Sequence, residues 1–289
     1  MMAGPLVSTA WLADHLGEPD LRVLDATWYL PHLARDARAE HRAVRVAGAV
    51  YFDIDEIADK DTTLPHMLPA AAAFGDAVGR LGVGDGDRVV VYGGRNLVAS
   101  ARVWWTLRAF GHATVWVLDG GLPRWRAEGR PIEAGLATPV PRRFTARRRP
   151  ELVRDLAAMQ ANAAAPREQV PRHAPEQVVD ARSAGRFAAT EPEPRAGLRG
   201  GHIPGSRSLP YDRLFDAEGG LLSPPVLRGI FQGVGLDLRA PITTTCGSGA
   251  TACVLAVGLA AAGGPDAAVY DGSWTEWGGR ADTPVDTGA

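Results

Sequence analysis

The feature that most constrains this chain of 289 residues is an internal repeat about half its length. The segment "VLDGGLPRW", which contains Asp119, matches "VYDGSWTEW", which contains Asp271. Asp25 and Asp180 likewise end two short apolar runs that occupy the same place in each half. A repeat of this length is typical of two copies of one domain rather than a solenoid of short units. The chain is also long enough for two domains, each with its own core.

Short β-branched runs alternate with helical patterns in both halves, which predicts the α/β class: mostly parallel sheets flanked by helices. We expect an N-terminal domain at 1–136, a linker at 137–175 and a C-terminal domain at 176–289. The expected strands are 21–26, 88–92, 114–118, 177–180, 240–242 and 267–270, and the expected helices are 9–16, 69–81, 98–110, 225–233 and 254–262.

The expected linker contains an arginine-rich run, "PRRFTARRRPE", that ends at Glu151. Basic runs can bind nucleic acid, but aromatic side chains do not alternate with these arginines. The net charge of −2 gives no general argument for nucleic acid or a membrane surface as a partner either. We therefore expect a strap, solvated or between the domains, and a short helix near 152–162.

Cys246 is the candidate nucleophile. It follows a β-branched run and precedes an apolar helical pattern, so it should lie on the turn between a strand and a helix N-terminus. Gly247 and Gly249 let the backbone curl there, so that several N–H groups can face the sulfur. The positive field at a helix N-terminus favours the nucleophilic thiolate. A buried structural cysteine in a glycine turn is the alternative interpretation.

Cys253 is the second of two cysteines, and we expect a packed core thiol two turns into the same helix. Two cysteines without a Cys/His cluster argue against a disulfide scaffold or a zinc site and favour a reducing compartment. Residues 1–16 lack the basic region and apolar core of a secretory signal. The longest apolar helix is too short to span a bilayer. These observations predict a cytoplasmic protein.

Five segments together resemble the tandem-rhodanese sulfurtransferases, and within them the 3-mercaptopyruvate sulfurtransferases. They are "YFDIDEIADKDTTLPHMLP", "VWWTLRAFGH", "GRFAATEPEPRAGLRGGHIPG", "CGSGATA" and "YDGSWTEWG". The resemblance covers nearly the whole chain. It implies two rhodanese domains with an active site at their interface. The first domain would lack the catalytic cysteine, and its corresponding loop lies near Gly93, Gly94 and Arg95. No cofactor or metal is implied.

The resemblance also implies a reaction. Cys246 would attack the sulfur of 3-mercaptopyruvate, hold it as a persulfide and release pyruvate, and the sulfur would then pass to a thiol acceptor or cyanide. A thioredoxin-like protein is the acceptor that the family suggests. The N–H groups of the loop, formed by Gly247, Gly249, Ala250 and Thr251, would stabilise the sulfur anion.

A proton relay of Ser248, His66 and Asp55 is implied by the same family. It would remove the donor's thiol proton or return one to the pyruvate enolate. Taken alone, Ser248 is equally well explained as a turn hydroxyl that caps the helix, whereas His66 and Asp55 are better explained as a surface histidine and as a turn or cap residue. Pro65 stands where the family has an acidic residue, which leaves the orientation of the His66 ring open.

Arg186 and Arg195 match the family's donor-binding pair. Their guanidinium groups suit the carboxylate and keto oxygens of the donor. The alternative for Arg186 is an ion pair with Glu191 or Glu193 on the surface.

Several other residues of the second half are expected to be structural. Asp180 and Arg182 should form an ion pair at a strand end, and His202 should brace a loop. Trp274 and Trp277 should form an apolar wall under the Cys246 loop.

Three other functions compete with this interpretation. A thiosulfate sulfurtransferase of the same fold should carry basic side chains directly after the cysteine, where this chain has Gly247 and Ser248. A cysteine phosphatase would need an arginine where Ala252 stands. A passive persulfide carrier or binding module would not need nucleophile, relay and arginines together.

Overall fold

The structure, a computed structural model, describes residues 4–30, 33–94, 97–165 and 176–288. The chain forms two compact units. The first comprises Met1–Lys60, Leu68–Arg149 and Phe215–Leu221, and the second comprises Asp61–Met67, Pro150–Leu214 and Leu222–Ala289. Each half of the sequence therefore contributes one short segment to the other unit. The expected linker is divided after Arg149, and its residues 166–175 lie outside the described part; the sequence boundaries of the domains stay a prediction.

The first unit contains a five-stranded parallel sheet in the order β1-β6-β5-β2-β4. Its strands are β1 (Leu6–Val7), β2 (Leu21–Asp25), β4 (Val50–Tyr51), β5 (Arg88–Tyr92) and β6 (Val115–Leu118). Its helices are α1 (Thr9–His15), α2 (Ala37–Ala43), α3 (Ala71–Arg80), α4 (Val98–Ala109) and α5 (Gly121–Ala127). A separate antiparallel pair joins β3 (Arg45–Val46) to β7 (Ile132–Glu133).

The second unit repeats this topology in a five-stranded parallel sheet of order β10-β9-β11-β12-β8. Its strands are β8 (Val153–Arg154), β9 (Gln177–Asp180), β10 (Arg207–Ser208), β11 (Ile242–Thr245) and β12 (Ala268–Tyr270). Its helices are α6 (Leu156–Ala164), α7 (Ala184–Phe187), α8 (Pro224–Gly233), α9 (Ala250–Ala261) and α10 (Ser273–Trp277). Because β9, β11 and β12 hold the places of β2, β5 and β6, the predicted pair of α/β copies is confirmed.

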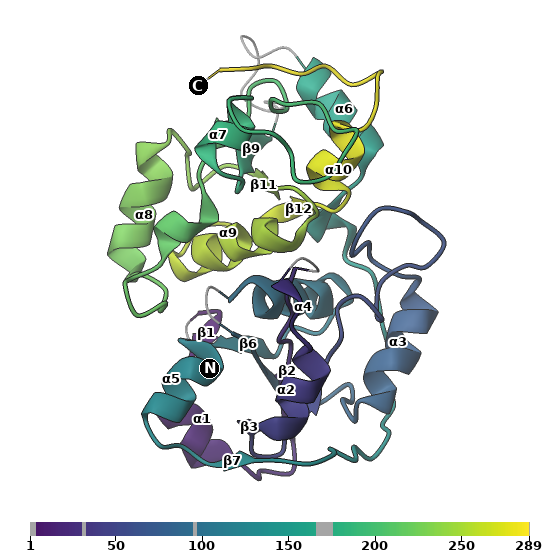
Figure 1. The fold of residues 1–289 in the computed structure, drawn as a ribbon, viewed down its shortest axis with the longest axis vertical. Helices are drawn as coiled ribbons and strands as arrows, with labels where there is room; N and C mark the ends of the chain where they lie inside the picture. The colour runs from purple at the N-terminus through teal and green to yellow at the C-terminus, as the bar shows by residue number, and fades with distance from the viewer. Residues whose placement is uncertain (1–3, 31–32, 95–96, 166–175, 289) are drawn as a thin grey trace. The chain divides into compact units, whose positions relative to one another are not determined.

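Helices cover both faces of the second sheet. Figure 1 shows α8 and α9 on one side of the strands and α10 on the other. On the α10 side, Met159 of α6 and Trp274 and Trp277 of α10 pack with Val178 and Tyr270 in one buried apolar cluster. Cover on both faces explains why β9, β11 and β12 are buried at nearly every position rather than at alternate ones.

Most expected elements are present with shifted ends; α6 and α9 each begin four residues from their expected start. Helix α9 begins at Ala250, because Gly249 ends the preceding loop in the left-handed conformation, with φ +78°. The expected start at residue 254 was therefore wrong by one turn. Cys253 lies in the first turn of the helix rather than two turns in, although its burial is as predicted.

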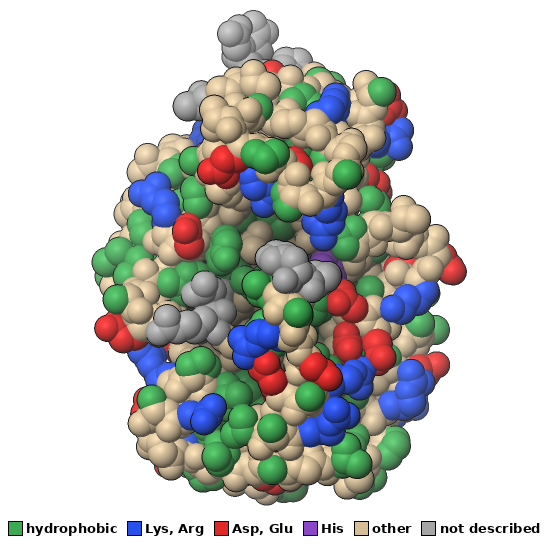
Figure 2. Space-filling view, viewed as in Figure 1, with side chains coloured by type: hydrophobic (Ala, Val, Ile, Leu, Met, Phe, Trp, Pro, Cys, Tyr) green, Lys and Arg blue, Asp and Glu red, His purple; other side chains and the backbone are tan. Residues whose placement is uncertain are grey.

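The arginine-rich run is a strap on the first unit. Its backbone amides at Arg142 and Arg147 donate to carbonyls of Gly79 and Phe110, both at 2.9 Å. Gly79 on α3 permits this approach, since a Cβ there would lie 2.5 Å from the Arg142 carbonyl oxygen. The Arg142 guanidinium also bonds Asp87. Basic and acidic side chains are intermixed on the face shown in Figure 2.

None of the helices in the described ranges has the length and apolar character needed to cross a membrane.

Candidate active site

Cys246 lies at the carboxyl end of β11, the central strand of the second sheet, four residues before α9 begins. Its thiol is free and buried. The backbone N–H of Gly249 donates a hydrogen bond to the Cys246 sulfur at 3.1 Å. The predicted position on a strand-to-helix turn is therefore confirmed, and one N–H group of the expected cradle already faces the sulfur. Ala250 and Thr251 form the first helical residues behind it.

Helix α10, which follows β12, holds the Cys246 loop in place. The buried Ser273 hydroxyl accepts a hydrogen bond from the Cys246 amide at 3.3 Å and donates one to the Tyr270 carbonyl at 2.8 Å. Thr275 binds the Gly247 carbonyl twice, through its amide at 2.9 Å and its hydroxyl at 2.6 Å. Sequence reasoning missed both residues, although they lie inside the repeated "DGSWTEW" segment.

Trp274 and Trp277 are the residues of this segment whose place was predicted. The Trp274 amide donates to the Cys246 carbonyl at 2.9 Å, and the Trp274 ring is buried. The indole N–H bonds the Arg199 carbonyl at 2.9 Å, which fixes the ring. The Trp274 amide thus supports the Cys246 loop, while the rings of Trp274 and Trp277 lie in one core cluster; the apolar wall under the loop stays a prediction.

Ser248 is half-buried on the turn between Cys246 and α9. Within the described ranges its hydroxyl makes no hydrogen bond, and Gly249 rather than Ser248 is the N-cap of the helix. The alternative interpretation of Ser248 as a helix cap is therefore wrong. Its hydroxyl can bind a substrate group or another side chain.

The other two members of the expected relay lie in different units. Asp55 belongs to the first unit, and its carboxylate accepts a hydrogen bond from the Trp28 indole at 2.7 Å. His66 belongs to the second unit, as Ser248 does. Its ring is buried, so the alternative of a surface histidine is wrong. The relay of Ser248, His66 and Asp55 stays a prediction.

Arg186 reaches the Cys246 loop from α7. An ideal Cβ built on Gly247 would lie 3.0 Å from Nη2 of Arg186, so the guanidinium lies against the residue that follows Cys246. The same guanidinium donates to Glu193 from Nη2 at 2.6 Å and from Nε at 3.2 Å. Glu191 instead accepts from the Ser183 hydroxyl at 2.6 Å. Arg186 therefore forms the ion pair with Glu193 that was the alternative interpretation, and it also lies beside the Cys246 loop, where a donor-binding arginine is expected.

Arg195 lies half-buried on the loop that follows Glu193. Among the residues that the structure describes, its guanidinium forms no hydrogen bond or ion pair. This arginine therefore retains its full capacity to bind an anion.

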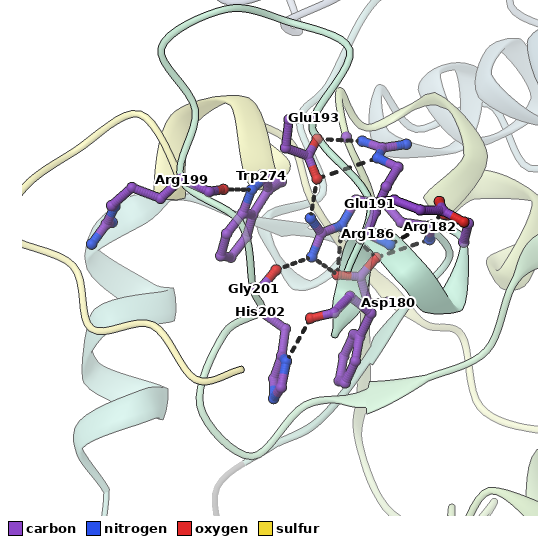
Figure 3. A network of polar contacts seen from close by, with 12 residues as sticks. Asp180, Arg182, Arg186, Glu191, Glu193, Arg199, Gly201, His202 and Trp274 are labelled. Atoms are coloured by element: carbon purple, nitrogen blue, oxygen red, sulfur yellow. Dashed lines mark hydrogen bonds and ion pairs between the residues drawn. The ribbon is translucent and has the colours of Figure 1, made fainter. Parts of the chain in front are cut away.

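Asp180 and Arg182 form the buried ion pair that was predicted (Figure 3). Nη2 of Arg182 donates to Asp180 at 2.6 Å and to the Gly201 carbonyl at 2.8 Å, and the guanidinium lies 4.3 Å from the Trp274 ring centroid. Burial disfavours the charge of Arg182, but Asp180 and Glu193 outweigh it and raise the pKa of the guanidinium above its usual value.

His202 braces a loop, as predicted. Its ring stacks on Phe187 with centroids 3.7 Å apart, and its Nδ1 lies 2.9 Å from the Phe187 carbonyl oxygen. These contacts occupy one face and one nitrogen of the ring in a structural role.

Comparison with known proteins identifies the family of this chain. The family described as rhodanese-like domain matches residues 8–128 and 161–280. The human 3-mercaptopyruvate sulfurtransferase is 43% identical over 278 residues, covering 94% of this chain and 91% of the relative. The rat thiosulfate sulfurtransferase is 44% identical over 285 residues, covering 96% and 92%.

A solved structure agrees with these relatives. The Escherichia coli protein SseA, described as a 3-mercaptopyruvate sulfotransferase of rhodanese fold, is 34% identical, with a TM-score of 0.83 and coverage of 94% of this chain and 99% of that one. The loop near Gly93 carries no cysteine, and Arg95 lies outside the described residues. With two matched domains and a cysteine on the active loop of the second alone, the chain belongs to the rhodanese family, in its tandem-domain form.

Proposed function

We propose that this protein is a sulfurtransferase that moves sulfur from 3-mercaptopyruvate to a thiol acceptor through a persulfide on Cys246. The observation that carries the proposal is the hydrogen bond from the Gly249 amide to the Cys246 sulfur, at the N-terminus of α9. An N–H group aimed at a sulfur before α9 favours an anion there, first the thiolate and then the persulfide.

The reaction has two displacement steps. The Cys246 thiolate attacks the donor sulfur, an S–S bond forms, and the carbon–sulfur bond of the donor breaks. The bonding electrons leave on the pyruvate enolate, which takes a proton to become pyruvate. An acceptor thiolate then attacks the outer sulfur of the persulfide, takes it, and releases the Cys246 thiolate. We propose a thioredoxin-like protein as the cellular acceptor, as the family resemblance suggests.

The remaining roles follow from position and chemistry. Arg195 and Arg186 bind the carboxylate and keto oxygens of the donor. Ser248, His66 and Asp55 move the proton between the donor thiol and the enolate. The half-buried Ser248 hydroxyl, two residues from the nucleophile, supports its place at the start of this relay.

The loop itself favours 3-mercaptopyruvate over thiosulfate. Gly247 lies directly against the Arg186 guanidinium, so a basic side chain at this position would meet a like charge. The neutral Gly247 and Ser248 add no positive charge for a dianion. Relatives named for either donor match this chain at nearly the same identity, 43% and 44%. Comparing kcat/KM for the two donors therefore tests the preference.

Intact-protein and peptide mass spectrometry tests the persulfide. Reduced protein is mixed with 3-mercaptopyruvate and then with an excess of thiol. We expect a gain of one sulfur atom on the Cys246 peptide, together with pyruvate release, and loss of that sulfur on thiol addition. Cys253→Ser is the matched control and should still take up sulfur. Sulfur found on Cys253 alone, or on neither cysteine, would contradict the proposal.

A further inference from the structure

Four charged side chains of alternating sign form a network in the second unit (Figure 3), and one of them, Arg186, lies against Gly247 of the Cys246 loop. Asp180 binds Arg182 at 2.6 Å, Arg182 binds Glu193 at 2.7 Å, and Glu193 binds Arg186 at 2.6 Å. Two carboxylates therefore face two guanidinium groups, and their formal charges cancel.

Only one end of this network meets solvent. The side chains of Arg182, Asp180 and Glu193 are 0%, 1% and 1% exposed, whereas that of Arg186 is 22% exposed. Arg182 and Asp180 satisfy each other in the interior through several hydrogen bonds. Glu193 is therefore the group whose charge offsets Arg186 where Arg186 touches Gly247.

Arg195 differs from Arg186 in this respect. Its guanidinium has no carboxylate partner in the described ranges, so its charge is not offset by a neighbour. Arg186 retains N–H groups that can donate to a donor oxygen, but Glu193 balances its charge. The arginine pair thus offers two hydrogen-bonding forks and one uncompensated positive charge.

We propose that Glu193 determines donor specificity by neutralising Arg186, so that the donor site matches a monoanion such as 3-mercaptopyruvate better than a dianion such as thiosulfate. The inference rests on the proposed function, in which Arg186 and Arg195 bind the donor. Removing the Glu193 charge leaves one more uncompensated positive charge beside Gly247. That charge strengthens the binding of a dianion more than the binding of a monoanion.

The kinetic test compares kcat/KM for thiosulfate and 3-mercaptopyruvate in three variants. We expect Glu193→Gln to raise the thiosulfate to 3-mercaptopyruvate ratio about tenfold, and Glu193→Asp, which keeps the charge, to stay within about twofold of the wild type. Glu191→Gln is the matched control, because Glu191 lies on the same loop but binds Ser183 rather than an arginine. Equal losses for both donors in Glu193→Gln, as a purely structural role produces, would overturn the proposal.

A second measurement needs neither a variant nor turnover. Methanesulfonate and sulfate are tetrahedral anions of similar size that differ by one charge, and calorimetric titration of the reduced wild-type protein compares their affinities. We expect dissociation constants within about threefold of each other. Sulfate binding more than about tenfold tighter, or no binding of either anion, would contradict the charge balance. If the two anions bind with the expected affinities but no pyruvate is released from 3-mercaptopyruvate, the error lies in the proposed reaction and not in the charge balance.

Discussion

The Gly249 amide donates a hydrogen bond to the Cys246 sulfur at 3.1 Å while Gly249 itself has a φ of +78°. The left-handed conformation of Gly249 ends the loop and lets α9 begin at the next residue. One residue thus both donates a hydrogen bond to the Cys246 sulfur and ends the loop from which α9 begins.

Gly249→Ala should therefore weaken both stability and turnover. A Cβ in the left-handed region costs about 1–2 kcal/mol, and relief of that strain rotates the N–H group away from the sulfur. Gly263→Ala is the matched control, because Gly263 has a φ of +74° just beyond the other end of α9. Thermal unfolding should show similar losses for both variants, while the rate of persulfide formation should fall only in Gly249→Ala. An equal rate in the two variants would contradict the role of the Gly249 amide.

Ser273→Ala should slow the enzyme through the backbone of its nucleophile. The change leaves the Cys246 amide and the Tyr270 carbonyl without their bond to a buried hydroxyl, at a cost of about 1–3 kcal/mol. We expect a lower kcat in steady-state assays at a temperature where the variant remains folded. Ser206→Ala removes a hydroxyl bond to the Ile203 carbonyl, at 2.7 Å, and should leave kcat unchanged. A wild-type kcat in Ser273→Ala would show that the Cys246 loop holds itself in place.

Replacing a glycine by alanine should change the stability of the fold in opposite directions at Gly258 of α9 and Gly229 of α8. A Cβ on Gly258 would lie 2.7 Å from the buried Leu214 side chain and 3.2 Å from the Phe231 ring, so Gly258→Ala should destabilise the fold by about 1–3 kcal/mol. A Cβ on Gly229 of α8 would meet no atom within 4 Å, so Gly229→Ala should stabilise by up to about 1 kcal/mol. Urea unfolding measures both. Stabilisation by both substitutions would show that the core around α9 accommodates the added Cβ without strain.

His112 should make the folded state less stable as the pH falls. Burial lowers the pKa of its imidazole, against the pull of the Asp87 and Asp85 carboxylates. The folded state therefore binds fewer protons than the unfolded state as the pH falls through about 6.5, and stability decreases over that range. His112→Gln cannot titrate, so its Tm should fall less than that of the wild type between about pH 7.5 and 5.5. An identical fall in both proteins would assign the acid sensitivity to other groups.

Local patterns predicted the parts of the fold that depend on local sequence. The strands β5 and β9 have the expected bounds, and α1 begins at the expected residue, where the Ser8 hydroxyl accepts a hydrogen bond from the Trp11 amide. Two-residue strands such as β1 and β10 carry no detectable periodicity and were not predicted. The start of α9 was missed because its first turn, at Ala250–Cys253, has no apolar alternation, so that only the backbone of Gly249 marks it.

The candidate site shows the same division. Cys246 and the ion pair of Asp180 and Arg182 could be read from spacing along the chain. The bond between Cys246 and Ser273 joins residues 27 positions apart and exists only because β11 and β12 are neighbours in the sheet. Glu193 was foreseen as a surface partner of Arg186, but its burial depends on contacts with Arg182 that no local pattern contains.

The central claim is that Cys246 carries sulfur from 3-mercaptopyruvate to an acceptor. The most direct test measures pyruvate release from 3-mercaptopyruvate, beside thiocyanate formation from thiosulfate and cyanide, at equal donor concentrations in the wild type and in Cys246→Ser. We predict a kcat/KM that favours 3-mercaptopyruvate and no turnover of either donor by the folded variant. Turnover retained in Cys246→Ser would contradict the claim, and a ratio that favours thiosulfate would contradict the donor and the roles given to Arg186 and Arg195.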